Sequence, residues 1–322
     1  MLDPIEFSLN DQTEIWTALN ADAANSALTD DDWRVFEMSK YYRALAETTG
    51  RQFPLIEYYT DHLLLSADGA KHTELRKRTA TQFSKTSQEV YVARREVVTS
   101  MLDKFQTTGE CDLVLDIVSP AARAVVMALC GVSTTLATSD MLAPSRSVGR
   151  LKRIEAELAI MRDFVENNFP NEDEDQKANR VTLALIGHEP LKAGLSINLM
   201  AVLNAHSGKR LCDMLWPKEL NNAVLSNIIR ISSPELRANG CPMKAVRIDT
   251  QVFVDDPENA QPSAIFVRGK HSCMGRGISS MIWSALVNGL SQSQRRVEVL
   301  AYEPPEHWLF NLPKKAEIRI FT

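Results

Sequence analysis

The chain has 322 residues, of which 44% are hydrophobic and 24% charged, and its formal net charge is −5. This composition excludes a disordered chain, and the length is enough for one large domain or two ordinary ones. No tract of lysine and arginine interleaved with aromatic residues is present, so the sequence predicts no nucleic-acid partner.

The N-terminal segment Met1–Gln12 is polar and acidic, and no basic region followed by an apolar stretch marks a signal peptide. Apolar runs such as Val181–Ile186 are too short to span a bilayer, which predicts no membrane partner. The five cysteines are odd in number and lack Cys-x-x-Cys spacing. We therefore expect a reducing, cytoplasmic location rather than a disulfide scaffold.

The first half of the chain predicts helices. Lys71–Lys104 contains no Gly or Pro and repeats apolar residues at helical intervals. Asp112–Leu129 is a more apolar segment that stops at Gly131, a residue typical of helix ends.

The middle of the chain predicts two further helices. Asn171–Gln176 is expected to be a solvated acidic loop, and Val181–His206 a long buried helix that tolerates Pro190 in its interior. Asn221–Ile231 is expected to form another helix, ended by the Ser-Ser-Pro sequence that follows it.

The residue pattern of the C-terminal part predicts strands as well as a helix. Ala245–Val254 alternates β-branched residues and predicts a short strand or hairpin, followed by a loop over Asp255–Ser263. Gly275–Leu290 returns to helix, and Arg296–Thr322 predicts short strands around a turn at two prolines. The sequence thus predicts one domain, residues 1–322, that is mainly α with a minor β part.

One loop contains the residues expected to bind a metal. A thiolate ligand of heme iron needs nearby N–H donors and basic residues, a backbone that passes close beneath a flat macrocycle, an aromatic neighbour and a helix dipole aimed at the sulfur. Phe266, Gly269, Cys273 and Gly275, followed by a helix from Arg276, provide these features. The alternative is a buried structural cysteine in a glycine-containing turn.

The spacing Phe-x-x-Gly-x-His-x-Cys-x-Gly resembles the heme-binding signature of the cytochrome P450 family, with every defining position filled. The resemblance implies a P450-like fold and a heme b cofactor (iron protoporphyrin IX). It also implies that Cys273 is the axial iron ligand and that His271 contacts a heme propionate.

Two further segments resemble heme contacts of the family. His72 and Arg76 match its His-x-x-x-Arg pattern, and their i, i+4 spacing places both on one helix face, where they could reach one carboxylate. The alternative is a solvated helix face. Arg237 lies where the family often has another propionate-binding arginine.

The core motif of the family, Glu-x-x-Arg, is altered. Arg230 is kept, but Asn227 stands where the glutamate belongs. An amide can still accept a hydrogen bond from a guanidinium group, yet the charge-assisted pair is lost. The resemblance leaves open how a buried Arg230 is satisfied.

The oxygen-activation motif of the family is altered as well. Gly187 and Glu189 match it, but Pro190 replaces the expected threonine, whose hydroxyl helps to deliver protons. Proline also removes a backbone donor and opens the helix locally. Either His188, Glu189 or the substrate supplies protons, or dioxygen is not activated in the usual way.

The resemblance runs from His72 to the C-terminus, with deletions. Only 43 positions separate Arg230 from Cys273, fewer than is usual for the family. The N-terminal region, the substrate-covering region (132–180) and the pre-cysteine loop (238–265) are all predicted to be abbreviated. A shortened member of this kind predicts a thin roof over the site, or a roof completed by a second subunit in a homo-oligomer.

The function that the resemblance implies is a heme-thiolate monooxygenase or oxidase acting on a small organic substrate, in specialised biosynthesis. One alternative keeps the heme but is peroxide-driven, a dehydratase or an isomerase; another is a non-catalytic partner or activator protein. The electron donor would be a ferredoxin-type protein or hydrogen peroxide. A basic patch for an acidic donor is expected from six residues: Arg76, Lys77, Arg78, Arg268, Lys270 and Arg276.

Overall fold

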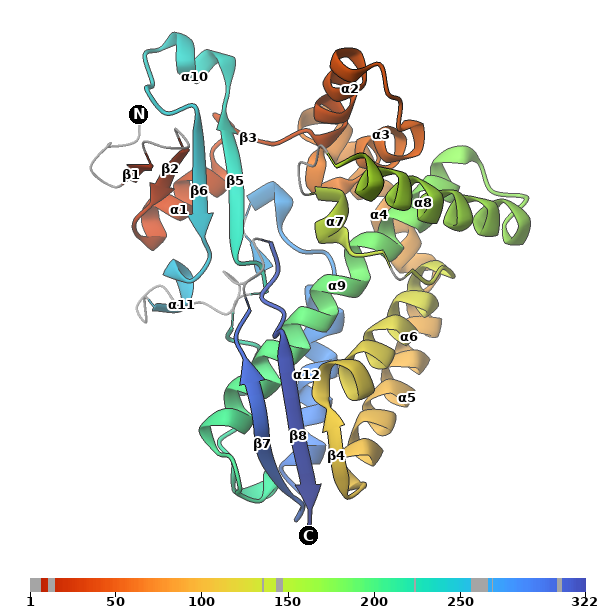
Figure 1. Cartoon of the computed structure of the whole chain (residues 1–322), viewed down its shortest axis with the longest axis vertical. Coiled ribbons are helices and arrows are strands. Elements are labelled where there is room, and N and C mark those ends of the chain that lie inside the picture. The colour runs from red at the N-terminus through yellow and green to blue at the C-terminus, as the bar shows by residue number, and fades with distance from the viewer. Residues whose placement is uncertain are drawn as a thin grey trace. The chain divides into compact units, whose positions relative to one another are not determined.

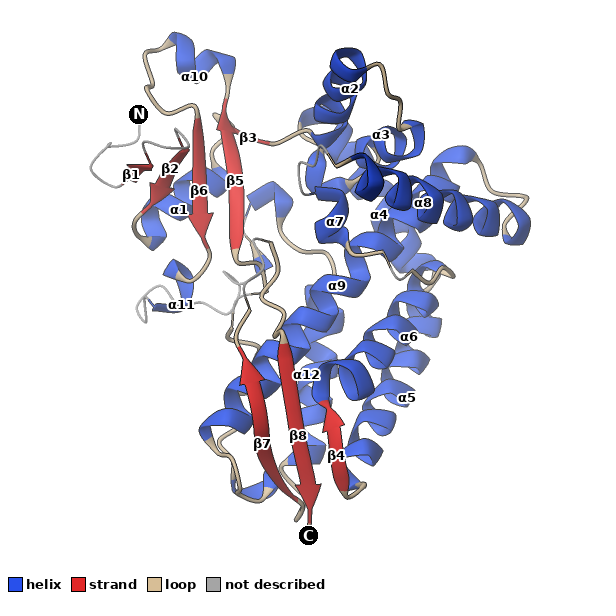
Figure 2. Cartoon of the chain, in the orientation of Figure 1, coloured by secondary structure: helices blue, strands red, loops and turns tan. Residues whose placement is uncertain are grey.

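The computed structural model describes residues 7–10, 15–134, 136–142, 147–222, 224–255, 266–267, 269–305 and 309–322. Helices dominate these residues and strands form a smaller part (Figure 2). The helices are α1 Ala21–Thr29, α2 Met38–Thr49, α3 Pro54–Asp61, α4 Gly69–Lys85, α5 Ser87–Gln106, α6 Ser119–Cys130, α7 Thr138–Leu142, α8 Val148–Asn168, α9 Glu174–Ala205, α10 Pro234–Ala238, α11 Val252–Asp255 and α12 Arg276–Leu290. The strands are β1 Phe7–Asn10, β2 Ile15–Ala18, β3 Trp33–Val35, β4 Gly109–Asp112, β5 Asn227–Ser232, β6 Ala245–Asp249, β7 Arg296–Glu303 and β8 Lys315–Phe321.

Most of the predicted elements are confirmed. The segment from residue 71 to 104 forms α4 and α5, and the apolar segment after it forms a short π-helical stretch, Leu113–Val118, that continues into α6. The long helix containing Pro190 is α9, the helix behind the cysteine is α12, and the C-terminal strands are β7 and β8. The predicted strand after residue 245 is β6, and most of the loop expected after it lies outside the described residues.

Two predicted elements are wrong. Asn221–Ile231 does not form a helix: residues 227–232 are strand β5, which pairs with β6 in antiparallel register. Three isoleucines in this segment favour a strand, and the pairing with β6 decides against the helix. The predicted acidic loop Asn171–Gln176 is wrong in its second half. Residues from Glu174 onward are helical, and Glu174 and Asp175 lie in the first turn of α9. Acidic side chains are favoured there, since they face the positive end of the helix dipole.

The chain forms two compact units. Unit 1 comprises Met1–Arg34, Arg94–Ala122 and Pro190–Thr322, and unit 2 comprises Val35–Ala93 and Arg123–Glu189. Three helices, α5, α6 and α9, contribute residues to both units, and the boundary within α9 falls at Pro190.

A five-stranded sheet has the strand order β1-β2-β6-β5-β3 (Figure 1). Strand β2 runs parallel to β6, whereas β5 and β6 are antiparallel. Apolar side chains of this region pack with α1 in one cluster, which includes Trp33, Val246 and Ile248. The alanine-rich helix α1 lies close to this cluster, because Ala23, Ala24 and Ala27 add little bulk.

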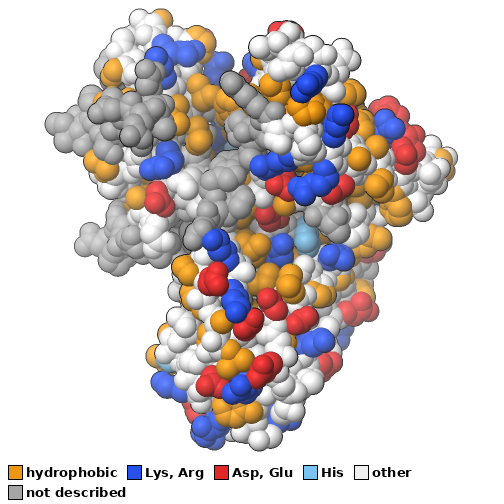
Figure 3. Space-filling model, in the orientation of Figure 1, with side chains coloured by type: hydrophobic (Ala, Val, Ile, Leu, Met, Phe, Trp, Pro, Cys, Tyr) orange, Lys and Arg blue, Asp and Glu red, His pale blue; other side chains and the backbone are white. Residues whose placement is uncertain are grey.

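A second sheet of three antiparallel strands has the order β4-β8-β7. Its central residue Arg319 forms ion pairs on both sides, at 2.6 Å with Glu110 and at 3.1 Å with Glu298. The register places both glutamates directly opposite Arg319. Figure 3 shows acidic and basic side chains interspersed over this region, and such exposed cross-strand pairs each contribute little to stability.

In unit 2, side chains of other segments cap the C-terminal end of α6. Arg180 donates to the carbonyl of Cys130 at 2.7 Å, forms a two-point pair with Glu172, and stacks 3.7 Å over the ring of Phe169. Gly131 ends the helix with a φ of +71°, and an added Cβ would lie 2.6 Å from that ring. The glycine is therefore required both for its backbone conformation and for space.

One described segment, Leu113–Cys130, is long and apolar enough to cross a membrane by length and composition, with a mean hydropathy of 1.9. Within the protein, 56% of this segment is buried. A core helix passes the same test, so this is weak evidence for a membrane span.

Candidate functional site

The loop that carries Cys273 is built by local hydrogen bonds in unit 1. The N–H of Cys273 donates to the carbonyl of Phe266 at 2.9 Å, and the N–H of Ser272 donates to that of Gly269 at 3.1 Å. Residues Gly269–His271 form a short 3-10 turn, η6, and α12 begins at Arg276. These bonds fold the segment back on itself and place the cysteine just ahead of a helix N-terminus.

Glycine is required at one point of this loop. Gly269 has a φ of +72°, and an added Cβ would lie 3.1 Å from the backbone oxygen of Leu28 in α1. The backbone of the loop therefore passes directly against the end of α1. Lys270 strengthens this attachment with an ion pair of 2.9 Å to Asp31.

Val267 adopts the left-handed region, with a φ of +63°, although it is β-branched. This conformation is unfavourable for such a residue and persists only where the surroundings enforce it. Val267 packs against the apolar cluster of the five-stranded sheet, and its neighbour Phe266 is buried. The core of unit 1 thus holds the beginning of the cysteine loop.

The side chains around the sulfur differ in exposure. Cys273 is exposed and His271 is buried. None of the five cysteines, all within the described ranges, forms a disulfide. An added Cβ on Gly275 would lie 3.7 Å from the sulfur of Cys273, so the glycine leaves that side of the sulfur open. The guanidinium group of Arg276 lies 5.8 Å from the centre of the Phe266 ring.

The cysteines differ in burial. Cys130 is fully buried at the end of α6, and burial raises the pKa of its thiol to about 12, so it stays protonated at neutral pH. Cys273, exposed ahead of α12, has the accessibility that a metal ligand needs. Among the described residues, no group of three or more His, Cys, Asp or Glu side chains is placed to hold a metal ion.

In unit 2, α4 presents the two residues predicted to bind a carboxylate. His72 is buried and Arg76 is half-buried, one turn further along the same face. Leu75 and Thr79 complete the buried stripe, and the hydroxyl of Thr79 donates to the side chain of Asn179 in α9 at 3.0 Å. The predicted common face of His72 and Arg76 is confirmed as helix geometry, and their ligand stays a prediction.

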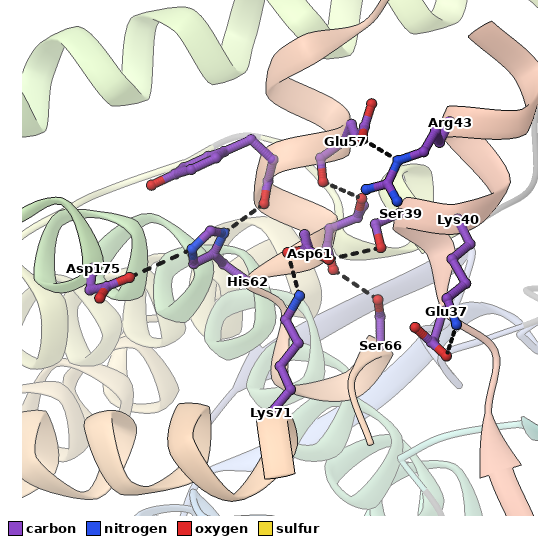
Figure 4. Close-up of polar contacts among 12 residues, drawn as sticks. Glu37, Ser39, Lys40, Arg43, Glu57, Asp61, His62, Ser66, Lys71 and Asp175 are labelled. Atoms are coloured by element: carbon purple, nitrogen blue, oxygen red, sulfur yellow. Dashed lines mark hydrogen bonds and ion pairs between the residues drawn. The ribbon is translucent and has the colours of Figure 1, made fainter. Parts of the chain in front are cut away.

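A polar network holds the first turn of α4 (Figure 4). Lys71, the neighbour of His72, forms an ion pair with Asp61 at the end of α3, and Asp61 accepts a further hydrogen bond of 3.0 Å from Ser39 of α2. Arg78 of the same helix pairs with Asp175 of α9 at 2.7 Å, and Asp175 also lies 3.8 Å from His62. These contacts orient α4 and therefore the face that carries His72.

This network predicts a pH-dependent contribution to stability. Burial by itself raises the pKa of Asp61, but the bonds from Lys71 and Ser39 outweigh it and lower the pKa below the ordinary value of 3.8. A carboxyl group with a lowered folded-state pKa stabilises the protein above its unfolded-state pKa and loses that contribution as the pH falls through the folded value. We expect Asp61→Asn to cost about 0.5 kcal/mol at neutral pH, as for a partly exposed pair.

The measurement is urea unfolding of wild type and Asp61→Asn over a series of pH values. The difference between them should be full above pH 3.8 and should shrink toward zero below it. A difference that is the same at acidic and neutral pH would show that Asp61 acts only through packing.

The residues predicted to handle protons lie on α9 of unit 2. Gly187 packs against Val126 of α6, and an added Cβ would lie 3.0 Å from that side chain, so the glycine also serves close helix packing. His188 and Glu189 are both buried. Glu189 accepts two bonds from Ser139 of α7, one from the N–H at 2.9 Å and one from the hydroxyl at 2.8 Å.

Asn227 and Arg230, predicted to form the altered core motif, do not lie on a helix. Because Asn227 and Arg230 lie on strand β5, three positions apart, their side chains project from opposite faces. Arg230 is buried and Asn227 is half-buried. The interpretation of these residues as a helical Glu-x-x-Arg counterpart is therefore wrong.

Other predicted residues belong to several elements of both units. Arg237 lies on the short helix α10 and is exposed. In the predicted basic patch, Arg78 is paired with Asp175 and Glu74, Lys270 is paired with Asp31, and Arg268 lies outside the described residues. Ion pairing of this kind weakens the positive field of the patch.

The structure thus brings Phe266, Gly269, His271, Cys273 and Gly275 together in one loop of unit 1. It places the residues predicted on α4 and α9 in unit 2. Sequence reasoning missed the partner of Glu189, because Ser139 lies 50 residues away and no local pattern marks it.

Comparison with known proteins finds likeness in structure alone. No family model and no curated protein matches the chain. P450 RauA, solved with a biosynthetic intermediate of aurachin RE, has a TM-score of 0.71 and 12% identity, over 99% of this chain and 94% of its own. The P450 heme domain of Tepidiphilus thermophilus has a TM-score of 0.68 and 16% identity, over 98% and 91%. P450BioI, solved with an acyl carrier protein ligated to hexadec-9Z-enoic acid, has a TM-score of 0.67 and 14% identity, over 94% and 91%.

These matches cover at least 91% of each neighbour, which argues against the strong overall shortening expected from the sequence. The local abbreviation of 132–180 and 238–265 stays a prediction. Helices predominate, a minor sheet part accompanies them, and the likeness extends over nearly the whole chain. The chain therefore has the cytochrome P450 fold.

Proposed function

We propose that the chain is a heme-dependent oxidoreductase that binds iron protoporphyrin IX through the thiolate of Cys273. The observation that carries this proposal is the cysteine loop of unit 1, which presents an exposed sulfur immediately before the N-terminus of α12. A helix N-terminus stabilises a negative charge placed near it, so a thiolate is favoured at this position. The cytochrome P450 fold supports the same proposal.

The residues of the loop fit a heme. The sulfur of Cys273 is accessible, Gly275 leaves space beside it, and the aromatic residue Phe266 lies in the same loop. When bound, the heme would supply the oxidising chemistry, with the thiolate increasing electron density at the iron. His271 of the loop, with His72, Arg76 and Arg237, is proposed to bind the propionates, as the sequence resemblance implies.

The chain's own contribution is to bind and orient the substrate, to exclude water and to control protons. His188 and Glu189 are buried on α9, and Gly187 brings that helix close to α6. We assign the holding and donation of a proton to Glu189, whose carboxylate is held by two hydrogen bonds from Ser139. The substrate class proposed is a small organic molecule of a biosynthetic pathway; RauA, a neighbour in fold, was solved with such an intermediate.

A second function has one observation in its favour. Pro190 occupies the position that follows Glu189 and carries neither a hydroxyl nor an N–H group. A peroxide-driven enzyme, a dehydratase or an isomerase would use the same heme without the usual activation of dioxygen.

The test is to express the chain with heme supplementation and to record the absorption spectrum of the reduced, carbon monoxide-bound protein. A thiolate-ligated heme gives a red-shifted Soret band. Turnover with hydrogen peroxide alone, compared with a ferredoxin, its reductase and NADPH, then separates the two functions. A chain that folds but takes up no heme would contradict both and would favour a partner or activator protein.

A further inference from the structure

Two hydroxyl side chains at the beginning of α7 contact the same turn of α9. The hydroxyl of Thr138 donates to the carbonyl of Leu185, and the hydroxyl of Ser139 donates to the Glu189 carboxylate at 2.8 Å. All four residues lie in unit 2, and Leu185 and Glu189 lie in the part of α9 just before Pro190. Thr138 and Ser139 have only 0% and 3% of their surface exposed, and Glu189 has 6%. Hydrogen bonds between groups this buried are strong and hold them in place, because no water competes.

The two contacts differ in chemistry. Thr138 bonds a backbone carbonyl, in the last turn before a proline that cannot donate an N–H of its own. That bond can fasten the helix but cannot influence a proton. Ser139 bonds an ionisable side chain with both its N–H and its hydroxyl, one to each carboxylate oxygen. Two donors on one residue fix both the position and the rotation of the carboxylate.

We infer that Ser139 is a positioning residue for Glu189, supplying from α7 the hydroxyl partner that Pro190 cannot provide within α9. This inference rests on the proposed function, in which Glu189 donates a proton. A proton is delivered efficiently only from a donor held within hydrogen-bond reach of its acceptor in one orientation. The bond to Ser139 supplies that orientation across 50 positions of sequence.

The experiment compares three substitutions in the heme-loaded chain. Ser139→Ala removes the hydroxyl but keeps the N–H bond to Glu189. Ser139→Thr restores a hydroxyl, and Thr138→Val removes the neighbouring hydroxyl that bonds only a backbone carbonyl. The probe is hydrogen peroxide, with a phenolic reporter as the electron donor, and kcat, the KM for peroxide and the solvent hydrogen-isotope effect are measured.

We expect Ser139→Ala to lower kcat about tenfold, to change the KM for peroxide little and to raise the solvent isotope effect, because only proton delivery is impaired. Ser139→Thr should recover most of the rate. Thr138→Val should lower the melting temperature without changing kcat or the isotope effect. If Ser139→Ala and Thr138→Val lose kcat equally, in proportion to lost stability, the inference is overturned. Ser139 would then serve only to stabilise the packing of α7 against α9.

An infrared measurement separates this inference from the proposed function. The carboxylate stretching band of Glu189, assigned by its loss in Glu189→Gln, should shift in Ser139→Ala and stay in place in Thr138→Val, with or without heme. An unshifted band in Ser139→Ala contradicts the pair itself. A shifted band in a chain that binds no heme and turns over no peroxide confirms the pair but refutes the proposed function and, with it, the role in proton donation.

Discussion

Replacing Cys273 by alanine should abolish the red-shifted, carbon monoxide-bound Soret band and reduce heme affinity by more than about a hundredfold. Loss of groups that merely support a metal ligand already costs about 10–100-fold in affinity, and loss of the ligand itself costs more. Cys273 is the only one of the five cysteines in this loop, all of which lie within the described residues. The measurement is heme titration followed by the reduced difference spectrum.

Cys212→Ala is the matched control, since Cys212 belongs to the same unit and is partly exposed. It should keep both the band and the affinity. Circular dichroism should show an unchanged helical content in Cys273→Ala, because an exposed side chain contributes little to the fold. A full red-shifted band in Cys273→Ala would assign the thiolate elsewhere and remove the basis of the proposed function.

Arg180→Ala should be among the most destabilising single substitutions in unit 2, costing about 3 kcal/mol. The guanidinium group is 12% exposed, pairs in two points with Glu172, donates to the Cys130 carbonyl and stacks on Phe169. Its removal leaves a largely buried carboxylate and a helix-end carbonyl without their donor, which costs far more than the loss of a surface pair. Urea unfolding measures the effect.

Arg162→Ala tests whether this cost is special to the site. Arg162 is 46% exposed and pairs with its neighbour Asp163, so its removal should cost less than about 0.5 kcal/mol. Arg180→Lys should recover only part of the loss, because a lysine cannot form the planar two-point pair. Similar costs for Arg180→Ala and Arg162→Ala would mean that the α6 end is held by apolar packing alone.

Local pattern was enough to predict most helices and the cysteine loop. The apolar residues at helical intervals in α4 and α5, and the mostly apolar sequence of α9, predict helices that the structure contains. The loop is set by side-chain identities within eleven positions, and its bonds, such as Cys273 to Phe266, are local. Features of this kind depend on neighbours in sequence, so the sequence contains them.

Tertiary pairing overruled local pattern at β5. The local pattern of Asn221–Ile231 predicts a helix, but residues 227–232 lie between β6 and β3 in the sheet. Pairing favours the extended state, since neighbouring strands satisfy each other's backbone groups. The same pairing separates Asn227 from Arg230 and removes the helical motif that they were expected to form.

The sequence by itself determined that this protein is mainly helical, has a P450-like cysteine signature, and has an acidic residue just before a proline inside a long helix. Only the tertiary structure decided what surrounds these residues: that Gly269 lies against α1, that Lys71 is held by Asp61, and that Ser139 bonds Glu189. The physical reason is distance along the chain. Backbone and side-chain contacts between remote segments depend on how helices and strands pack, and no periodicity within one segment encodes its partner in another.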